Sequence, residues 1–293
     1  MASNATNTIL TPEIIAREAL MVLRNNAVMA NLVHRDYSSE FVAGKGDTIS
    51  IRKPATFVAN EFGGYIETQT ANETSVPVVM DKHLDVSFAV TSKELSLSIE
   101  DFSAQLLVPA MQAFADKVDK YLLYLERECA YRTQQIGDNM TPADLIAARK
   151  FLTQNAAPLA DRRFVVGAEG EAALLNNDLF VSADKVGDEG TALREASLGR
   201  KFGMDIYVDQ NIDEDMAPGI AFHKNALALV TRPLALPNGA AKAAIVNYDG
   251  FGLRVVYGYD MNTKTDTVSI DMLCGVALLD EKLIAVVQNQ IVN

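Results

Sequence analysis

The chain has 293 residues, of which 49% are hydrophobic and 22% are charged. This balance is typical of a globular protein with a sizeable core and excludes the disordered and fibrous classes. The formal net charge of −12 argues against binding nucleic acid by neutralising its phosphates. No apolar run reaches the ~20 residues needed to cross a bilayer, so we expect no membrane contact.

The first predicted elements are a helix and a pair of strands. Residues 7–31 predict a start segment with a helix, because Thr11-Pro12-Glu13 supplies an N-cap and a proline at the first helical position. Residues 47–52 alternate as a short strand, and residues 84–90, which also alternate, are expected to pair with it. The long polar stretch between them predicts a β-hairpin that projects from the body and needs a neighbouring molecule to cover it.

The longest helical pattern follows the second of these strands. Ser98–Asp101 resembles a capping box, and apolar residues then recur at three- and four-residue steps as far as about Gln135. A helix of that length would measure roughly 50 Å. Pro109 lies inside the pattern, so a kink or a junction of two helices is an alternative to one straight rod.

The C-terminal half begins with helices and continues with strands. Thr141-Pro142-Ala143-Asp144 predicts a helix start, with a hydroxyl cap and an acid at the third helical position, and the helix is expected to end near Gln154. A strand at 164–167 and a helix at 169–175 should follow. Further strands are expected at 206–208, 219–222, 226–230, 253–259, 267–273 and 283–287, with a hairpin loop at 259–266. The order of elements predicts an α+β protein.

Patterns for catalysis, cofactors and metals are weak. Cys129 and Cys274 lie far apart and are interpreted as buried thiols, and the three histidines are equally scattered. Asp209–Asp213 matches the first ligands of a calcium loop, but Glu214 stands where glycine is required, so we interpret it as an acidic surface turn. Glu126/Glu128 is interpreted as a solvated helix face. We therefore predict no cofactor, no metal site and no catalytic residues.

Four regions, taken in their order along the chain, resemble those of a known family. They are 90–102, 200–212, 221–234, and the pair 252–260 and 271–277. Together with the order of segments they resemble the Hong Kong 97-type fold of tailed-phage major capsid proteins. The chain is most similar to the coat proteins that assemble with a separate scaffolding protein. The stretch from Pro233 to Tyr248 leaves no room for the extra inserted β-domain that some of those proteins carry.

This resemblance implies an α+β fold with an N-terminal arm, an extended β-hairpin loop, a long spine helix, a peripheral domain and an axial domain. The implied boundaries are 1–46 for the arm and its helix, 47–91 for the extended loop, 92–137 for the peripheral domain with the spine helix, 138–248 for the axial domain, 249–277 for the return strands of the peripheral domain, and 278–293 for a C-terminal strand that returns to the axial domain.

The same resemblance implies a structural protein and not an enzyme. It implies a subunit that self-assembles into the pentamers and hexamers of an icosahedral shell, built in the cytoplasm of the bacterial host and enclosing double-stranded DNA in the virion. Its expected partners are further copies of itself, a scaffolding protein and a portal protein, with a decoration protein left open. Contacts between copies are expected at Arg52, Lys53, Glu61, Gly63, Gly64, Tyr65 and Glu67. A shell subunit of an encapsulin-like bacterial compartment and a mixed α/β enzyme are the two alternatives.

Overall fold

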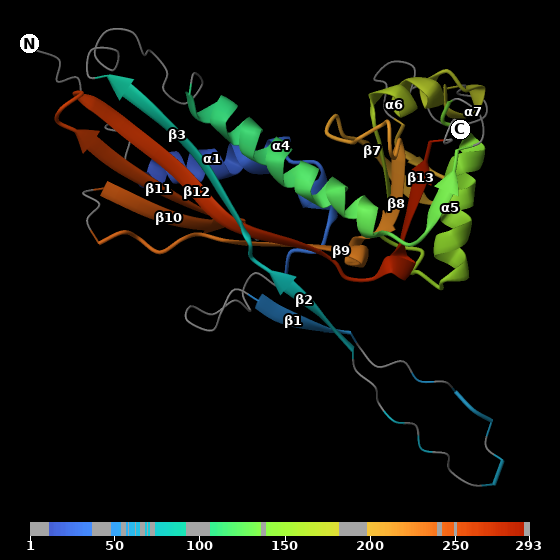
Figure 1. The fold of residues 1–293 in the computed structure, drawn as a ribbon. Coiled ribbons are helices and arrows are strands. Elements are labelled where there is room, and N and C mark those ends of the chain that lie inside the picture. Colours follow the sequence, from blue (N-terminus) through green and yellow to red (C-terminus); the bar gives the residue numbers. More distant parts are fainter. Residues whose placement is uncertain are drawn as a thin grey trace, which may run out of the picture.

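The computed structural model describes residues 12–36, 48–53, 57, 59–61, 63–64, 68, 70, 74–91, 106–135, 139–181, 198–238, 242–248 and 251–289. The predicted capping box at Ser98–Asp101 and the predicted N-cap Thr11 lie outside these residues. The described part consists of two sheets, helices against each of them, and a projecting pair of strands (Figure 1). None of its helices is long and apolar enough to cross a membrane.

An antiparallel five-stranded sheet forms the elongated body of the molecule. Its main path runs through β10 (Lys242–Tyr248), β11 (Phe251–Asp260), β12 (Thr265–Leu278) and β3 (Lys82–Thr91). The remaining strand, β9 (Leu227–Arg232), pairs with residues 273–278 of β12, beyond the stretch of β12 that pairs with β11. β9 and β10 therefore share a sheet with β11 and β12, although they fall inside the range 138–248 that the resemblance assigns to the axial domain.

Helices α1 (Pro12–Asn26), α2 (Met29–Leu32) and α4 (Val108–Tyr124) belong to this body (Figure 1). α1 buries Ile15, Ala19 and Leu23, which lie one turn apart along a single stripe that packs toward β10, β11 and α4. The helix predicted within residues 7–31 is confirmed at α1.

The long helix ends earlier than its apolar pattern predicts. α4 continues only as the 3-10 helix η3 (Leu125–Glu128), so the predicted end near Gln135 is wrong. The next residues form the strand β4 (Arg132–Gln134), whose backbone is paired by a strand from the far end of the chain. The α-helix begins at Val108, which places Pro109 in the first turn, where its missing N–H costs no helical bond.

A six-stranded mixed sheet forms the second body, in the order β4, β13 (Ile284–Gln288), β8 (Gly219–His223), β5 (Arg162–Val166), β7 (Met204–Val208) and β6 (Arg200–Lys201). Every residue of β8 is buried, as is typical of a strand covered on both faces. α5 (Pro142–Gln154), α6 (Ala168–Leu175) and α7 (Asp178–Val181) lie beside this sheet (Figure 1). The predicted start of α5 is confirmed, since the Thr141 N–H donates to the Asp144 carboxylate at 2.8 Å.

The predicted pairing of residues 47–52 with residues 84–90 is wrong. β1 (Thr48–Lys53) pairs with β2 (Thr74–Val79), whereas β3 pairs along ten residues of β12. Alternation identifies a strand and its two faces, but it does not identify the partner strand. A hairpin is nevertheless present, with its second strand ten residues earlier in the sequence than predicted.

Candidate assembly interface

The feature that stands apart from both bodies is the β1–β2 ribbon. Its six residue pairs run from Thr48↔Val79 at the body to Lys53↔Thr74 at the outer end. The described residues between 57 and 70 lie beyond that outer end, away from the rest of the molecule (Figure 1). All of them are exposed, including Phe57 with 63% of its surface. The segment beyond the ribbon therefore presents an aromatic side chain to solvent.

One face of this ribbon is covered by the body. Ile51 and Val78 are buried in a small cluster that also contains Met80, Ala228, Val230 and Leu279. Ile49 and Val76 lie half-buried against the same cluster. Because side chains alternate along a strand, the residues between them belong to the opposite face, which is exposed. The ribbon is thus anchored by one of its faces, and we call the cluster of six buried residues the hairpin root.

Gly275 of β12 permits the close approach of β2 at the hairpin root. A Cβ atom at this position would lie 2.3 Å from the carbonyl oxygen of Val79 and 3.0 Å from its carbonyl carbon. Both atoms belong to the backbone, so the contact is not relieved by rotating a side chain. Only glycine fits here without a displacement of β2.

Gly275→Ala is therefore expected to lower the free energy of unfolding by roughly 1–3 kcal/mol, because β2 must shift away from β12. Gly258→Ala in β11 is the matched control, since nothing lies within 4 Å of its Cβ position. Its effect should stay within about 0.5 kcal/mol. Urea unfolding of the unassembled subunit measures both values, and equal losses in the two variants would contradict the close approach.

The residues predicted to make contacts between copies do not form one cluster. Arg52 is exposed at the outer part of the ribbon, while the Nζ of Lys53 lies 3.8 Å from an Asp280 carboxylate oxygen of the same chain. Glu61, Gly63 and Gly64 are exposed beyond the ribbon. Gly64 has a φ of +97°, a conformation that favours glycine.

Tyr65 and Glu67 lie outside the described residues. The described members of the predicted contact set are therefore spread along one projecting arm, with Lys53 bound to the body.

Two buried carboxyl groups lie along α4 and η3. Asp119 is 1% exposed and accepts the backbone N–H groups of Val28 at 2.7 Å and Ala30 at 2.9 Å, which fixes the start of α2 against α4. Burial raises the pKa of Asp119 to about 7, although these two donors oppose the shift. Glu126 is 4% exposed, so its interpretation as a solvated acid was wrong, whereas Glu128 is exposed. Burial also raises the pKa of Glu126 to about 7, partly offset by the positive charge of Arg132.

The stability of the unassembled subunit is expected to fall as the pH rises from about 5 to 8. Glu126 has an ordinary pKa of 4.5 and a folded-state pKa of about 7, so the folded chain holds a proton that the unfolded chain has released. This contribution is complete below the ordinary pKa and is lost above the folded-state pKa.

Glu126→Gln should flatten this pH dependence and raise the free energy of unfolding at pH 8 by about 1–3 kcal/mol. Glu128→Gln changes an exposed neighbour and should leave the profile as it is in the wild type. Urea midpoints measured across the pH range test this pair, and an unchanged slope in Glu126→Gln would count against a buried proton.

The segment Asp209–Asp213 was interpreted as an acidic turn on the surface, but its first residue, Asp209, is buried, so the interpretation is wrong for that residue. Asp209 is 1% exposed and accepts the Asn211 backbone N–H at 2.9 Å and its side-chain amide at 3.1 Å. Burial raises the pKa of Asp209.

The described residues contain no group of three or more His, Cys, Asp or Glu side chains arranged to hold a metal ion. Cys129 and Cys274 are buried free thiols, as predicted.

Comparison with known proteins gives one kind of match. No family model and no curated protein sequence matches the chain. Among solved structures, a chain of Mycobacterium phage Che8 aligns with 89% of this chain and 90% of its own length, at a TM-score of 0.68 and 22% identity. The capsid structure of cyanophage P-SCSP1u aligns over 90% and 88%, at a TM-score of 0.63 and 13% identity.

A third structure is not from a phage. A virus-like particle from Pyrococcus furiosus aligns over 94% of this chain and 98% of its own, at a TM-score of 0.56 and 13% identity. Identities this low establish shared architecture. The chain has the mixed helix-and-sheet fold of tailed-phage capsid proteins.

Proposed function

We propose that this chain is a structural subunit of a phage icosahedral capsid, which self-assembles into pentamers and hexamers and encloses double-stranded DNA. The observation that carries the proposal is a fold shared with phage capsid chains along about nine-tenths of both lengths. The projecting arm supports it, because a two-stranded ribbon whose described outer residues are all exposed gains further contacts from a neighbour. Such a subunit acts through its interfaces and not through catalysis.

The described elements suggest how the parts of such a subunit are assigned. The β1–β2 ribbon with its outer segment would be the extended loop, and α4 would be the spine helix. The six-stranded sheet would be the axial domain, and the five-stranded sheet the peripheral domain. Because β9 and β10 belong to the five-stranded sheet, we place the end of the first axial segment near residue 226 instead of 248.

The proposed partners follow from this role. Copies of the chain would form the shell, a scaffolding protein would guide assembly in the host cytoplasm, and a portal protein would occupy one vertex. A decoration protein would bind, where present, to the outer surface. The net charge of −12 suits a container that encloses packed DNA without gripping its phosphates. The finished location would be the capsid of the virion.

One observation favours a second candidate function. The Pyrococcus furiosus virus-like particle matches nearly the full length of both chains, which supports a shell subunit of an encapsulin-like compartment. Its TM-score of 0.56 is below the 0.68 and 0.63 of the two phage structures. A cellular compartment would enclose protein cargo, whereas a capsid would enclose DNA.

Sedimentation velocity of the purified recombinant protein, alone and with a candidate scaffolding protein, tests the proposal. We expect large closed particles or five- and six-membered rings in at least one of the two conditions. Nuclease-protected DNA in particles from infected cells would favour the capsid, and a co-purifying protein cargo would favour the compartment. Monomers or small dimers under both conditions would contradict both.

A further inference from the structure

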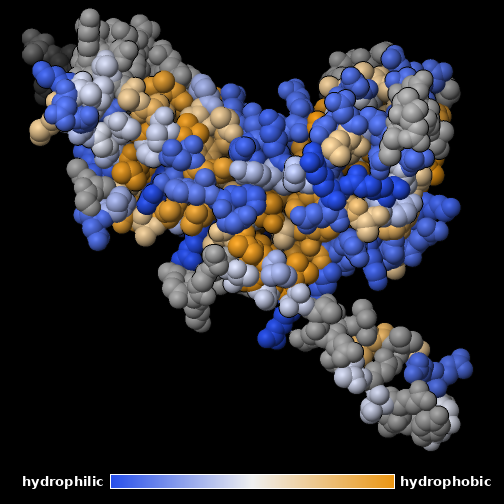
Figure 2. Space-filling model, in the orientation of Figure 1, coloured by the Kyte–Doolittle hydropathy of each residue, from blue (hydrophilic) through white to orange (hydrophobic). Residues whose placement is uncertain are grey.

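Three short segments carry the chain from one body to the other. They are the 3-10 helices η3, η4 (Lys224–Ala226) and η5 (Glu281–Leu283). Two of them are tied together, since the N–H of Leu279, two residues before η5, donates to the carbonyl of Ala226 at 2.7 Å. Figure 2 shows the two bodies as two lobes with a notch between them. The angle between the lobes therefore depends on the side chains that meet at this junction.

Buried acids meet at the junction from both sides. Asp119 and Glu126 come from α4 and η3, and Asp209 comes from the loop that follows β7 in the second body. Glu126 Oε2 and Asp209 Oδ2 are both buried and have no hydrogen-bond partner among the described residues. A buried oxygen without a donor is costly when it carries a negative charge, so this surrounding favours the protonated acids.

Asp119 and Asp209 face each other across the junction. Burial is the main cause that raises the pKa of Asp119, and the negative charge of Asp209 raises it further. Burial also raises the pKa of Asp209, which in turn faces Asp116 and Lys120 of α4, with opposite effects. Both Asp119 and Asp209 are 1% exposed, so water does not screen them from each other. If both lost their protons, the two carboxylates would repel each other.

Glu126 faces the same loop. Burial is the main cause of its raised pKa; the positive charges of Arg132 and Arg127 oppose the shift, whereas the negative charge of Asp213 adds to it. Arg127 is shared, because its Nη2 lies 3.7 Å from an Asp213 carboxylate oxygen.

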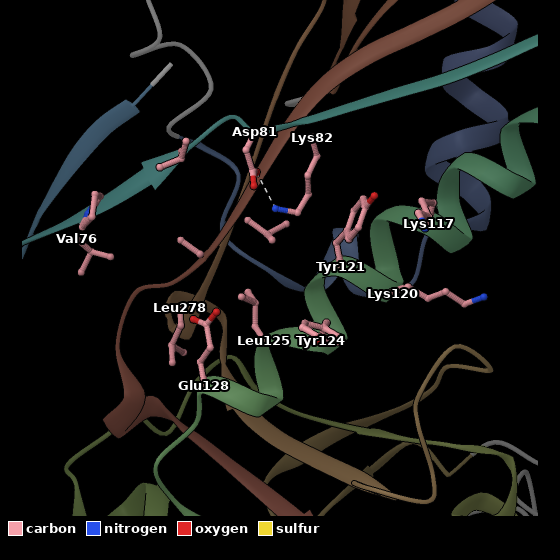
Figure 3. A pocket seen from close by; sticks show the side chains of 14 residues that line it. Val76, Asp81, Lys82, Lys117, Lys120, Tyr121, Tyr124, Leu125, Glu128 and Leu278 are labelled. Carbon is pink, nitrogen blue, oxygen red and sulfur yellow. Dashed lines mark hydrogen bonds and ion pairs between the residues drawn. The ribbon is translucent and has the colours of Figure 1, made fainter. Parts of the chain in front are cut away.

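The three acids are also kept from the open surface beside α4. A groove of about 720 Å³ lies there, with Tyr121, Tyr124 and Glu128 in its lining (Figure 3). Asp119, Glu126 and Asp209 do not belong to that lining. Release of their protons therefore leaves buried charges unless the junction opens to water.

We propose that Asp119, Glu126 and Asp209 form a proton-operated latch between the two bodies, closed while they hold their protons and loosened when these pass to solvent. Loss of the protons places negative charge on the α4–η3 rod and on the facing loop at once, so residues 209–217 move away from the rod and admit water. The latch is a property of the single subunit. In the proposed shell it would change the angle at which neighbouring copies meet, and that consequence alone rests on the proposed function.

Hydrogen–deuterium exchange of the unassembled subunit at pH 6 and pH 8 tests the latch, after correction for the intrinsic pH dependence of amide exchange. The reporters are amides that close the loop, such as Asn211 N–H, which donates to the Asp209 carboxylate at 2.9 Å, and Ala217 N–H, which donates to the Asp213 carbonyl at 2.8 Å. We expect opening of the loop to rise about tenfold between the two pH values, because the opened junction holds one proton fewer.

Strand β8, which is paired on both sides, distinguishes this local opening from global unfolding. The loop should exchange faster than β8 at both pH values. A low urea concentration should speed exchange in β8 but not in the loop, since urea acts in proportion to the surface that is exposed. A loop that exchanges only together with β8 would overturn the latch.

Glu126→Gln combined with Asp209→Asn should remove most of the rise, because neutral amides replace two of the acids. Asp215→Asn is the matched control, since it changes an exposed carboxylate of the same loop and should keep the wild-type rise. Equal protection of the wild-type loop at pH 6 and pH 8, or a wild-type rise in the double variant, would contradict the latch. The wild-type comparison decides the matter if the double variant does not fold, and neither result bears on whether the chain builds a shell.

Discussion

Replacing residues 54–73 with Asn-Gly is expected to abolish shell assembly while leaving the subunit folded. Lys53 and Thr74 are paired at the outer end of the ribbon, so a two-residue turn closes the hairpin without disturbing its register. The hairpin root stays intact, and the described residues that are removed are exposed. The variant loses every contact that the outer arm makes with a neighbour. Its particle yield should fall by about tenfold or more, as for any loss above ~1.4 kcal/mol.

Sedimentation velocity measures particles in this variant, and the thermal midpoint of the unassembled protein reports on its fold. A second variant, with a Gly/Ser segment of the original length in place of residues 54–73, separates the effect of chain length from that of the side chains. We expect both variants to stay unassembled with thermal midpoints close to that of the wild type. Particles at wild-type yield from the Asn-Gly variant would contradict an assembly role for the arm.

Arg254→Ala is expected to lower the free energy of unfolding by about 3–5 kcal/mol, the range for removing one partner of a buried ion pair. Arg254 of β11 and Asp271 of β12 are direct cross-strand neighbours. The guanidinium donates through Nε at 2.9 Å and through Nη2 to the two carboxylate oxygens of Asp271, which is 3% exposed. Without this partner, Asp271 keeps, among the described residues, the pair with His83, whose Nε2 lies 3.7 Å away.

Arg127→Ala is the matched control for this prediction. Its guanidinium lies 3.7 Å from Asp213, but both side chains are more than two-fifths exposed, so its loss should cost less than about 1 kcal/mol. The double variant Arg254→Leu, Asp271→Leu should recover much of the stability, because no buried charge remains unpaired. Urea unfolding of the unassembled subunit distinguishes these cases. Equal losses for Arg254→Ala and Arg127→Ala would show that the cross-strand pair is not a buried one.

The features that sequence reasoning predicted well are local ones. The start of α5 depends on Thr141 and Asp144, three residues apart, and the structure has the predicted capping box. The predicted hairpin loop between residues 259 and 266 joins β11 to β12. These two strands pair in antiparallel register from Asp260↔Thr265, next to the loop, to Arg254↔Asp271. In both cases, the interactions that define the element lie within a short stretch of chain.

The features that were missed depend on distant residues. The strand β4 interrupts an apolar helical pattern because it pairs in parallel with β13, more than a hundred residues later. β10 was missed because Lys242–Tyr248 lacks strict alternation, and its strand conformation comes from pairing with β11. Glu126 belongs to the run of three charged residues Glu126-Arg127-Glu128, and this run suggested a solvated face. Its burial becomes visible only when the segments that carry Arg132 and Asp213 are brought against it.

The candidate interface was predictable in outline but not in its anchoring. The long polar stretch after residue 53 indicated a projecting hairpin, and β1 with β2 forms one. Its attachment could not be predicted, because Ala228, Val230 and Gly275 reach the ribbon from strands far along the sequence.

A cryo-electron microscopy reconstruction of the assembled recombinant protein tests the central claim most directly. A shell subunit with this arm predicts closed icosahedral particles in which residues 57–70 of each copy lie on an adjacent copy. Particles whose arms contact only their own subunit would contradict the role given to the arm. A preparation that stays monomeric or dimeric, with and without a scaffolding protein, would contradict the claim that this chain builds a shell.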